Sequence, residues 1–279
     1  MTREKNISYD QYKTTREAIK SLRDQSELRI DDFPTQGLVF RSIKQFADKN
    51  LTTLWHKALG TMPANIFNFI IRYLNNSLAN NTNLRKWGVT NSSACPLCDK
   101  DQTLGHVLGG CQKALEDGRY NWRHDSVLLA ISSFLKSLDG IQTYCDIESF
   151  LSPSILTGDT YRPDMAVVRD NVVYILELTV GFETNIQKNS SRKRMKYTDL
   201  LCDLSHKFKD VKFTNLSMGS AGIIGSDDFT LGTMLASLGL DTKETSYLIK
   251  KISSVVIRSS YYIFCKRNKE WEQPELLSW

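Results

Sequence analysis

Four potential metal ligands lie close together in the chain and constrain its fold more than any other feature. They follow the pattern C-x2-C-x7-H-x4-C and are Cys95, Cys98, His106 and Cys111. Three thiolates and one imidazole complete the tetrahedral shell of a structural zinc ion, and a C-x2-C pair can turn back onto one ion. Four unrelated buried residues are the alternative, but they would rarely show this spacing. Because the shell is full, we predict a zinc knuckle that folds a small loop and contacts nucleic acid, without catalysis at the zinc.

Composition places the rest of the chain among ordinary globular proteins. Of its 279 residues, 41% are hydrophobic and 24% charged, so we expect a buried core. The chain contains no run of about 18 apolar residues, so we expect no membrane span. The N-terminus lacks an apolar signal region, so we expect neither secretion nor a disulfide framework, and we interpret Cys145, Cys202 and Cys265 as buried or inert thiols. The net charge of +5 is compatible with an anionic partner.

The hydrophobic pattern divides the chain into three parts. Residues 1–90 show helical spacing, with one helical stretch over 37–59 and a new helix after Pro63. Residues 91–124 contain the knuckle. Residues 125–279 are mixed, with a helix over 126–138 capped by Asp125, strands over 165–169, 172–180 and 211–218, and helices over 187–209, 231–240 and 245–266. The predicted fold class is therefore α/β, with a helical N-terminal region and a zinc knuckle before a mixed sheet flanked by helices.

Two acidic residues are predicted to face each other across a hairpin. Asp170 and Asn171 tolerate positive φ and form a plausible two-residue turn. In that register Asp164 lies opposite Glu177, with Cβ atoms about 4.5–5.5 Å apart. Two carboxylates this close are costly unless a cation or a proton lies between them, and an oxygen-rich pair suits Mg²⁺ or Mn²⁺. The alternative is that both acids are strand-end or solvent-facing residues. For Asp164 alone, which starts a strand after Pro163, we favour this alternative, whereas the apolar run around Glu177 argues against it.

A basic stretch follows the second strand. Such a run is usually a solvated helix face, but beside a carboxylate strand it becomes a candidate phosphate-binding surface that could stabilise a transition state. Its members are Lys188, Arg192, Lys193, Arg194, Lys196 and Tyr197.

The order of these motifs resembles one known protein family. The knuckle is followed by Trp122-Arg-His-Asp125, Arg162-Pro-Asp164, Glu177-Leu-Thr-Val180 and Arg192-Lys-x-x-Lys196-Tyr197. Over roughly residues 40–265, this order resembles the C-terminal region of site-specific ribosomal-DNA non-LTR retrotransposons that carry a restriction-like endonuclease. The resemblance implies a nuclease core of the PD-(D/E)xK superfamily within residues 125–279.

The resemblance also implies roles for individual residues. Asp164 and Glu177 would bind the catalytic Mg²⁺ or Mn²⁺. Thr179 stands where the general Glu-x-Lys pattern has lysine, so Lys193 or Lys196 on the next helix would replace it, and we favour Lys196 followed by Tyr197. Glu183 would be a further acid or a structural cap. Arg123 and His124 would lie near DNA, with helix packing or capping as the alternative for His124.

The implied activity is metal-dependent nicking of DNA, which in this family primes reverse transcription of the element RNA. The chain lacks a Tyr/Phe-x-Asp-Asp polymerase signature, so the reverse transcriptase portion of the same element would be a partner, together with target DNA and element RNA. A nuclear location follows from a DNA target. Two other hypotheses stay open: a catalytically inactive zinc-dependent nucleic-acid-binding module, and a helical interaction domain without a role on DNA.

Overall fold

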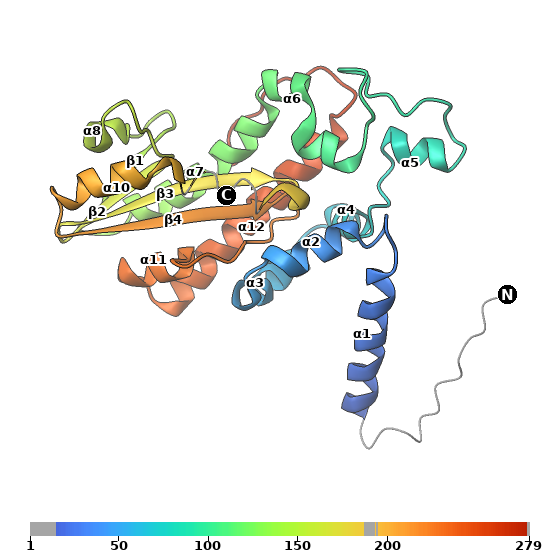
Figure 1. Cartoon of the computed structure of the whole chain (residues 1–279), viewed down its shortest axis with the longest axis horizontal. Helices are drawn as coiled ribbons and strands as arrows, with labels where there is room; N and C mark the ends of the chain where they lie inside the picture. Colours follow the sequence, from blue (N-terminus) through green and yellow to red (C-terminus); the bar gives the residue numbers. More distant parts are fainter. Residues whose placement is uncertain (1–14, 187–192, 194, 278–279) are drawn as a thin grey trace.

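The computed structural model describes residues 15–186, 193 and 195–277. Figure 1 shows a sheet with helices on both sides, a group of helices at one end of the sheet, and an N-terminal helix that projects away from the rest. The helices before the sheet are α1 (Thr15–Asp31), α2 (Leu38–Phe46), α3 (Lys49–Gly60), α4 (Ala64–Leu74), α5 (Asn81–Lys86), the π-helical turn η2 (His106–Gly110), α6 (Gln112–Glu116) and α7 (Arg119–Lys136). The remaining elements are β1 (Gln142–Cys145), α8 (Ser154–Thr157), β2 (Met165–Arg169), β3 (Val172–Gly181), the 3₁₀ turn η3 (Glu183–Asn185), α10 (Thr198–Ser205), β4 (Asp210–Gly219), α11 (Leu231–Ser237) and α12 (Thr242–Cys265).

The sheet has the strand order β1-β2-β3-β4, with antiparallel pairing up to β3 and a parallel pairing of β3 with β4. The turn between β2 and β3 is the predicted one, because Asp170 and Asn171 have φ values of 51° and 61°. Arg169 pairs with Val172, and Met165 with Leu176. The predicted register is thus confirmed, and Asp164 enters β2 directly beside the position of Glu177.

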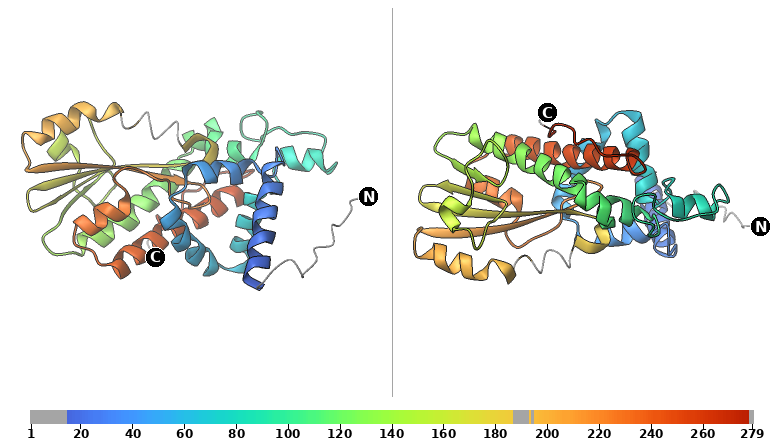
Figure 2. Two further views of the ribbon diagram at one scale, coloured as in Figure 1. Left: turned by 60° about the horizontal axis from the view of Figure 1, so that its bottom comes forward. Right: turned by 90° about the horizontal axis from the view of Figure 1, so that it is seen from above.

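The two faces of the sheet bury different helices. Leu176 and Leu178 of β3 belong to a core that also includes residues of α7, α11 and α12. Val173 and Ile175, which alternate with them, pack with Tyr197 and the α10 side chains. In both views of Figure 2, α7 and α12 lie on one side of the sheet and α10 on the other. Because β3 is covered on both faces, its sequence is a nearly continuous apolar run.

A second core joins the N-terminal helices to the rest of the chain. It contains side chains of α2, α3, α4 and η2, together with Ile257 and Ile263 from the C-terminal half of α12. The Trp55 indole of α3 donates a hydrogen bond of 2.8 Å to the carbonyl oxygen of Ala221, just beyond β4. The helical N-terminal region therefore packs firmly on the mixed region. None of the described helices combines the length and the apolar character that crossing a membrane requires.

Three details differ from the sequence-based expectation. The stretch 37–59 is two helices, because Ala47 is extended and pairs with Gly225. The helix expected from residue 126 begins at Arg119, so Asp125 lies inside α7 and is not its N-cap. Its first turns bury charged residues, Arg119 and Arg123, which hid the apolar pattern that marks a helix. Strand β1 and the short helix α8 were not predicted.

Candidate functional site

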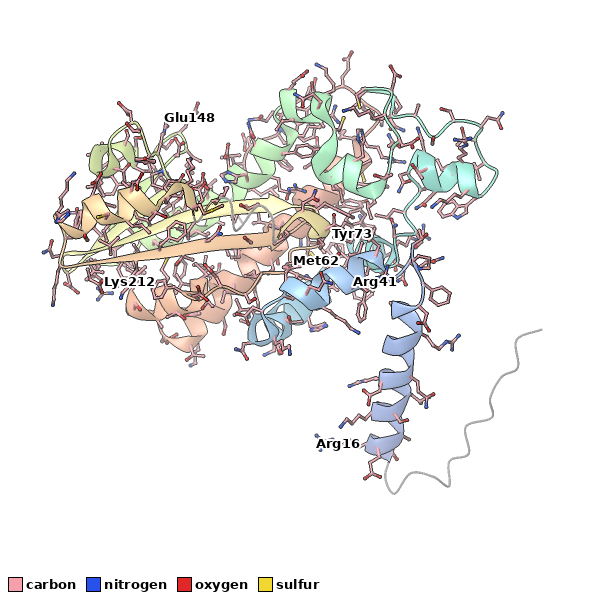
Figure 3. The ribbon with its side chains drawn as sticks, viewed as in Figure 1. Arg16, Arg41, Met62, Tyr73, Glu148 and Lys212 are labelled. Carbon is pink, nitrogen blue, oxygen red and sulfur yellow. The ribbon has the colours of Figure 1, made fainter. Side chains whose placement is uncertain are left out.

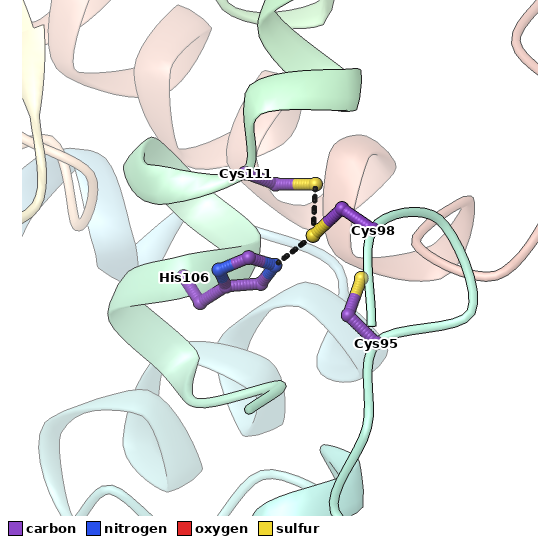
Figure 4. A group of neighbouring side chains, drawn as sticks. All are labelled: Cys95, Cys98, His106 and Cys111. Carbon is purple, nitrogen blue, oxygen red and sulfur yellow. Dashed lines mark hydrogen bonds between the residues drawn. The ribbon is translucent and has the colours of Figure 1, made fainter. Parts of the chain in front are cut away.

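The four predicted zinc ligands converge on one point. Their ligand atoms all lie within 4.8 Å of one another, as Figure 4 shows. The Cys98 Sγ lies 3.3 Å from the His106 Nε2 and 3.7 Å from the Cys111 Sγ. Two sulfurs bound to one tetrahedral zinc at about 2.3 Å are roughly 3.8 Å apart. Donor types and spacing therefore fit a structural zinc.

Local backbone structure brings these ligands together. After Cys95 the chain turns back on itself: the Asp99 amide donates to the Cys95 carbonyl oxygen at 2.9 Å, and Asp99 has a φ of 61°. His106 opens the turn η2, and Cys111 follows it directly. The Cys111 amide donates to the hydroxyl of Tyr120 on α7 at 3.2 Å. A tight turn and one π-helical turn thus aim all four side chains inward.

Burial affects the protonation of the last ligand. Cys95 and Cys111 are each 2% exposed, and burial raises the pKa of the Cys111 thiol to about 11. Without metal this thiol is neutral at pH 7, so zinc binding must release its proton.

Asp164 and Glu177 form the centre of a second cluster, where β2 begins. The Asp164 backbone amide donates to the Glu177 Oε2 at 3.2 Å, and the Leu178 amide donates to the Asp164 Oδ2 at 2.7 Å. Glu177 is 5% exposed, although it is a carboxyl residue in an apolar strand. The two carboxylates therefore lie side by side. The backbone amide of Asp164 holds the Glu177 carboxylate, and the amide that follows Glu177 holds the Asp164 carboxylate. Their oxygen-only donor set fits a divalent cation such as Mg²⁺ or Mn²⁺.

One of the two candidate lysines points at these carboxylates. The Lys193 Nζ lies 2.9 Å from the Glu177 Oε1 and 3.8 Å from the Asp164 Oδ2, and it donates to the Leu178 carbonyl oxygen. Lys196 is exposed; its Nζ lies 3.0 Å from the Tyr197 hydroxyl and over the Tyr197 ring. Lys193, and not the Lys196 that we favoured from the sequence, is therefore the lysine that lies beside the two carboxylates.

His124 joins α7 to the carboxylates. Its Nε2 lies 3.3 Å from the Asp164 Oδ2, and its Nδ1 lies 3.0 Å from the Asp125 Oδ1. Although burial opposes it, hydrogen bonds to Asp125 and Asp164 raise the pKa of His124 to about 9, so both ring nitrogens donate at neutral pH. The same bond from His124, together with Lys193, lowers the pKa of Asp164 despite the burial of that carboxyl. Asp164 is therefore ionised and held in one orientation.

Tyr197 lies next to the carboxylate cluster but is not exposed to solvent. It is fully buried, and its hydroxyl donates to the Arg162 carbonyl oxygen at 3.1 Å. Burial, reinforced by the nearby Glu177 carboxylate, raises the pKa of Tyr197 strongly. This hydrogen bond holds the backbone that leads into Asp164.

Comparison with known proteins relates the knuckle, but not the carboxylate cluster, to a family. Residues 38–116 match the family described as zinc-binding in reverse transcriptase. This match supports the retrotransposon resemblance for the part of the chain that it covers. It extends from α2 to α6 and so includes the helices that pack around the knuckle as well as the ligand loop. No curated protein matches the chain.

Arg123 does not occupy the position that the sequence suggested. It is fully buried, and its guanidinium donates to the Ser220 and Ser260 hydroxyls and to the Leu108 carbonyl oxygen at 2.9–3.2 Å. A side chain enclosed in this way cannot contact DNA. Arg123 instead ties η2, the end of β4 and α12 to one another.

Glu183 is a structural residue in the same buried region. Its carboxylate accepts hydrogen bonds from the Tyr73 hydroxyl and, at 3.0 Å, from the Ala221 amide. Figure 3 labels Tyr73 where α4 reaches the end of the sheet. Burial raises the pKa of Glu183, while the charge of Arg123 opposes that effect. Of the two roles open for Glu183, its position fits the structural one.

Three predicted nucleic-acid-binding residues, Lys188, Arg192 and Arg194, lie outside the described residues. Sequence reasoning missed Asp125 as a partner of His124, because it assigned Asp125 to a helix cap. Thr179 lies on the same face of β3 as Glu177, as alternation along a strand requires, and its buried hydroxyl has no partner among the described residues.

Proposed function

We propose that this protein is a divalent-metal-dependent DNA endonuclease of the restriction-like type, attached to a zinc-binding domain related to that of reverse transcriptases. The observation that carries the proposal is the meeting of Asp164, Glu177 and Lys193, from two strands and the following segment, in one half-buried cluster. Structural ion pairs rarely place two carboxylates side by side in an apolar strand pair. A perturbed, partly enclosed group of this composition is typical of a catalytic centre.

Each residue has a defined task in this proposal. Asp164 and Glu177 would hold the cation, which would lower the pKa of a bound water and neutralise phosphate charge. Lys193 would donate to the phosphate as negative charge develops on it. His124 orients Asp164, and Tyr197 positions the backbone before it. The zinc knuckle would bind nucleic acid and not take part in the chemistry.

The cellular setting follows from the resemblance. The nick would prime reverse transcription of an element RNA, with the polymerase portion of the element as partner. A nuclear location belongs to the same proposal.

A nicking assay on supercoiled plasmid tests the activity. With Mg²⁺ or Mn²⁺ the protein should convert supercoiled DNA to open circles, and Asp164→Asn and Glu177→Gln should abolish the conversion. Asp170→Asn is the matched control, because Asp170 lies in the exposed hairpin turn at the other end of β2. Equal nicking by the wild type and Asp164→Asn would refute the assignment.

A second candidate is a nucleic-acid-binding module without nuclease activity. It is favoured by the family match, which covers only the zinc-binding part of the chain. It predicts salt-dependent DNA binding by the zinc-loaded protein and no nicking under any divalent metal. The plasmid assay and a binding titration on the same preparation therefore separate the two candidates.

A further inference from the structure

A basic groove lies between α3 and α12. It encloses about 310 Å³. Lys57 of α3 and Lys250, Lys251 and Arg258 of α12 line it, and none of its lining residues is acidic. This charge is separate from the basic stretch that the sequence analysis identified beside the carboxylates.

The three lysines of the groove are not explained by internal pairing. On α12 they lie at helical spacing on one face, with Tyr247 at its start. Lys57, Lys250 and Lys251 form no ion pair with a carboxylate anywhere in the described part of the chain. Clustered like charges repel one another, so folding gains nothing from this arrangement. An external anion would remove the repulsion.

The groove also offers an aromatic surface and an apolar floor. Tyr247 is 53% exposed, and its ring centroid lies 6.1 Å from that of Phe134, which supports it from one side. Ala58 and Val255 form buried parts of the floor. A row of cations beside an exposed ring is the combination that binds single-stranded nucleic acid, because phosphates pair with the cations and an unstacked base stacks on the ring.

The groove and the carboxylate cluster are on different sides of the molecule. α12 packs against the face of the sheet that carries Leu176 and Leu178, whereas Lys193 and α10 belong to the opposite face. Both views in Figure 2 show α12 and α10 separated by the sheet. A strand in the groove would therefore be distinct from the DNA at the carboxylates.

We propose that the groove between α3 and α12 is a second nucleic-acid site, which binds a single strand through its phosphates and stacks one base on Tyr247. Recognition there is independent of sequence, since lysine contacts to phosphate and stacking on tyrosine read no base edge. The proposal does not depend on nuclease activity.

Fluorescence anisotropy with a labelled 20-nucleotide oligo-dT tests the proposal, using the zinc-loaded full chain with Asp164→Asn and no Mg²⁺. Replacing Lys57, Lys250 and Lys251 together by Gln should weaken binding at least tenfold. It should also reduce the slope of log K against log salt by about 2, since each phosphate contact contributes about 0.7. Tyr247→Ala should weaken binding about fivefold or more, and Tyr247→Phe should restore it.

A matched control separates the groove from general electrostatics. Lys207, Lys209 and Lys269 are exposed lysines outside the groove, and their joint replacement by Gln changes the net charge equally. Equal losses in the two triple variants would overturn the proposal, as would a Tyr247→Ala variant that binds oligo-dT like its parent. The groove triple variant should lose more affinity for the single strand than for a labelled duplex of equal length; an equal or larger loss on the duplex would contradict the single-strand assignment. All variants carry Asp164→Asn, so none of these binding measurements requires nuclease activity. The result therefore tests the groove even if the wild-type protein does not nick DNA.

Discussion

Lys193 and Glu177 form an ion pair of 2.9 Å although one follows β3 and the other lies within it. The pair places a cation beside two carboxylates in a site that is only partly open to solvent. The two lysines of the Arg192-Lys-x-x-Lys196-Tyr197 motif differ in this respect, because the Lys196 ammonium lies at Tyr197 instead.

We expect the two lysines to differ strongly in the nicking assay. Lys193→Met should reduce the single-turnover nicking rate about a hundredfold, the usual cost of removing one donor that stabilises a transition state. Lys196→Met should stay within about threefold of the wild type, because its ammonium does not contact either carboxylate. A larger loss in Lys196→Met than in Lys193→Met would contradict the assignment.

His124→Ala should lower the affinity for the divalent cation more than it lowers the stability of the fold. Losing the donor to Asp164 leaves that carboxylate less well oriented, and removal of such supporting groups typically lowers metal affinity 10- to 100-fold. A Mn²⁺ titration of the nicking rate should therefore shift to higher concentration, with partial recovery of the rate at saturation. His206→Ala, which changes the same residue type at the C-terminal end of α10, serves as the control. An unchanged titration curve in His124→Ala would show that the contact has no role in metal binding.

The purified protein should contain about one zinc per chain by elemental analysis. Cys98→Ser should lose the metal and unfold at a lower temperature, since binding free energy at a structural site is folding free energy. Cys202→Ser alters an exposed cysteine outside the cluster and should keep both the zinc content and the Tm. Stoichiometric zinc in Cys98→Ser would be incompatible with the proposed shell.

Arg123→Met should destabilise the chain by at least about 2 kcal/mol in urea unfolding, because it leaves the buried Leu108 carbonyl oxygen and the Ser220 and Ser260 hydroxyls without this donor. It also removes the positive charge that opposes the effect of burial on Glu183. The double variant with Glu183→Gln should lose less than the sum of the two single losses, since both charges are then removed. Arg85→Met, at an exposed position on α5, should change stability by less than about 0.5 kcal/mol. Strict additivity in the double variant would show that Arg123 and Glu183 are not coupled.

Features that depend only on residues close together in the chain could be predicted from the sequence. The zinc ligands were predictable because four donors within one loop have few ways to meet except around a metal. The facing of Asp164 and Glu177 was predictable because a two-residue turn and a period of two determine every pair in a hairpin. The start of α7 was not, because Arg119 and Arg123 are buried and compensated by groups from distant segments.

By itself, the sequence determined the ligand set of the knuckle, the strands β2, β3 and β4, and the register that brings the two carboxylates together. Only the tertiary structure decided that Lys193, not Lys196, reaches them, that His124 holds Asp164, and that Arg123 is enclosed. It also gathered Lys57 and the lysines of α12 into one groove. The physical reason is the range of the interactions: turns and strand pairs are set by neighbouring residues, whereas the direction of a long charged side chain depends on what packs around it from the rest of the chain.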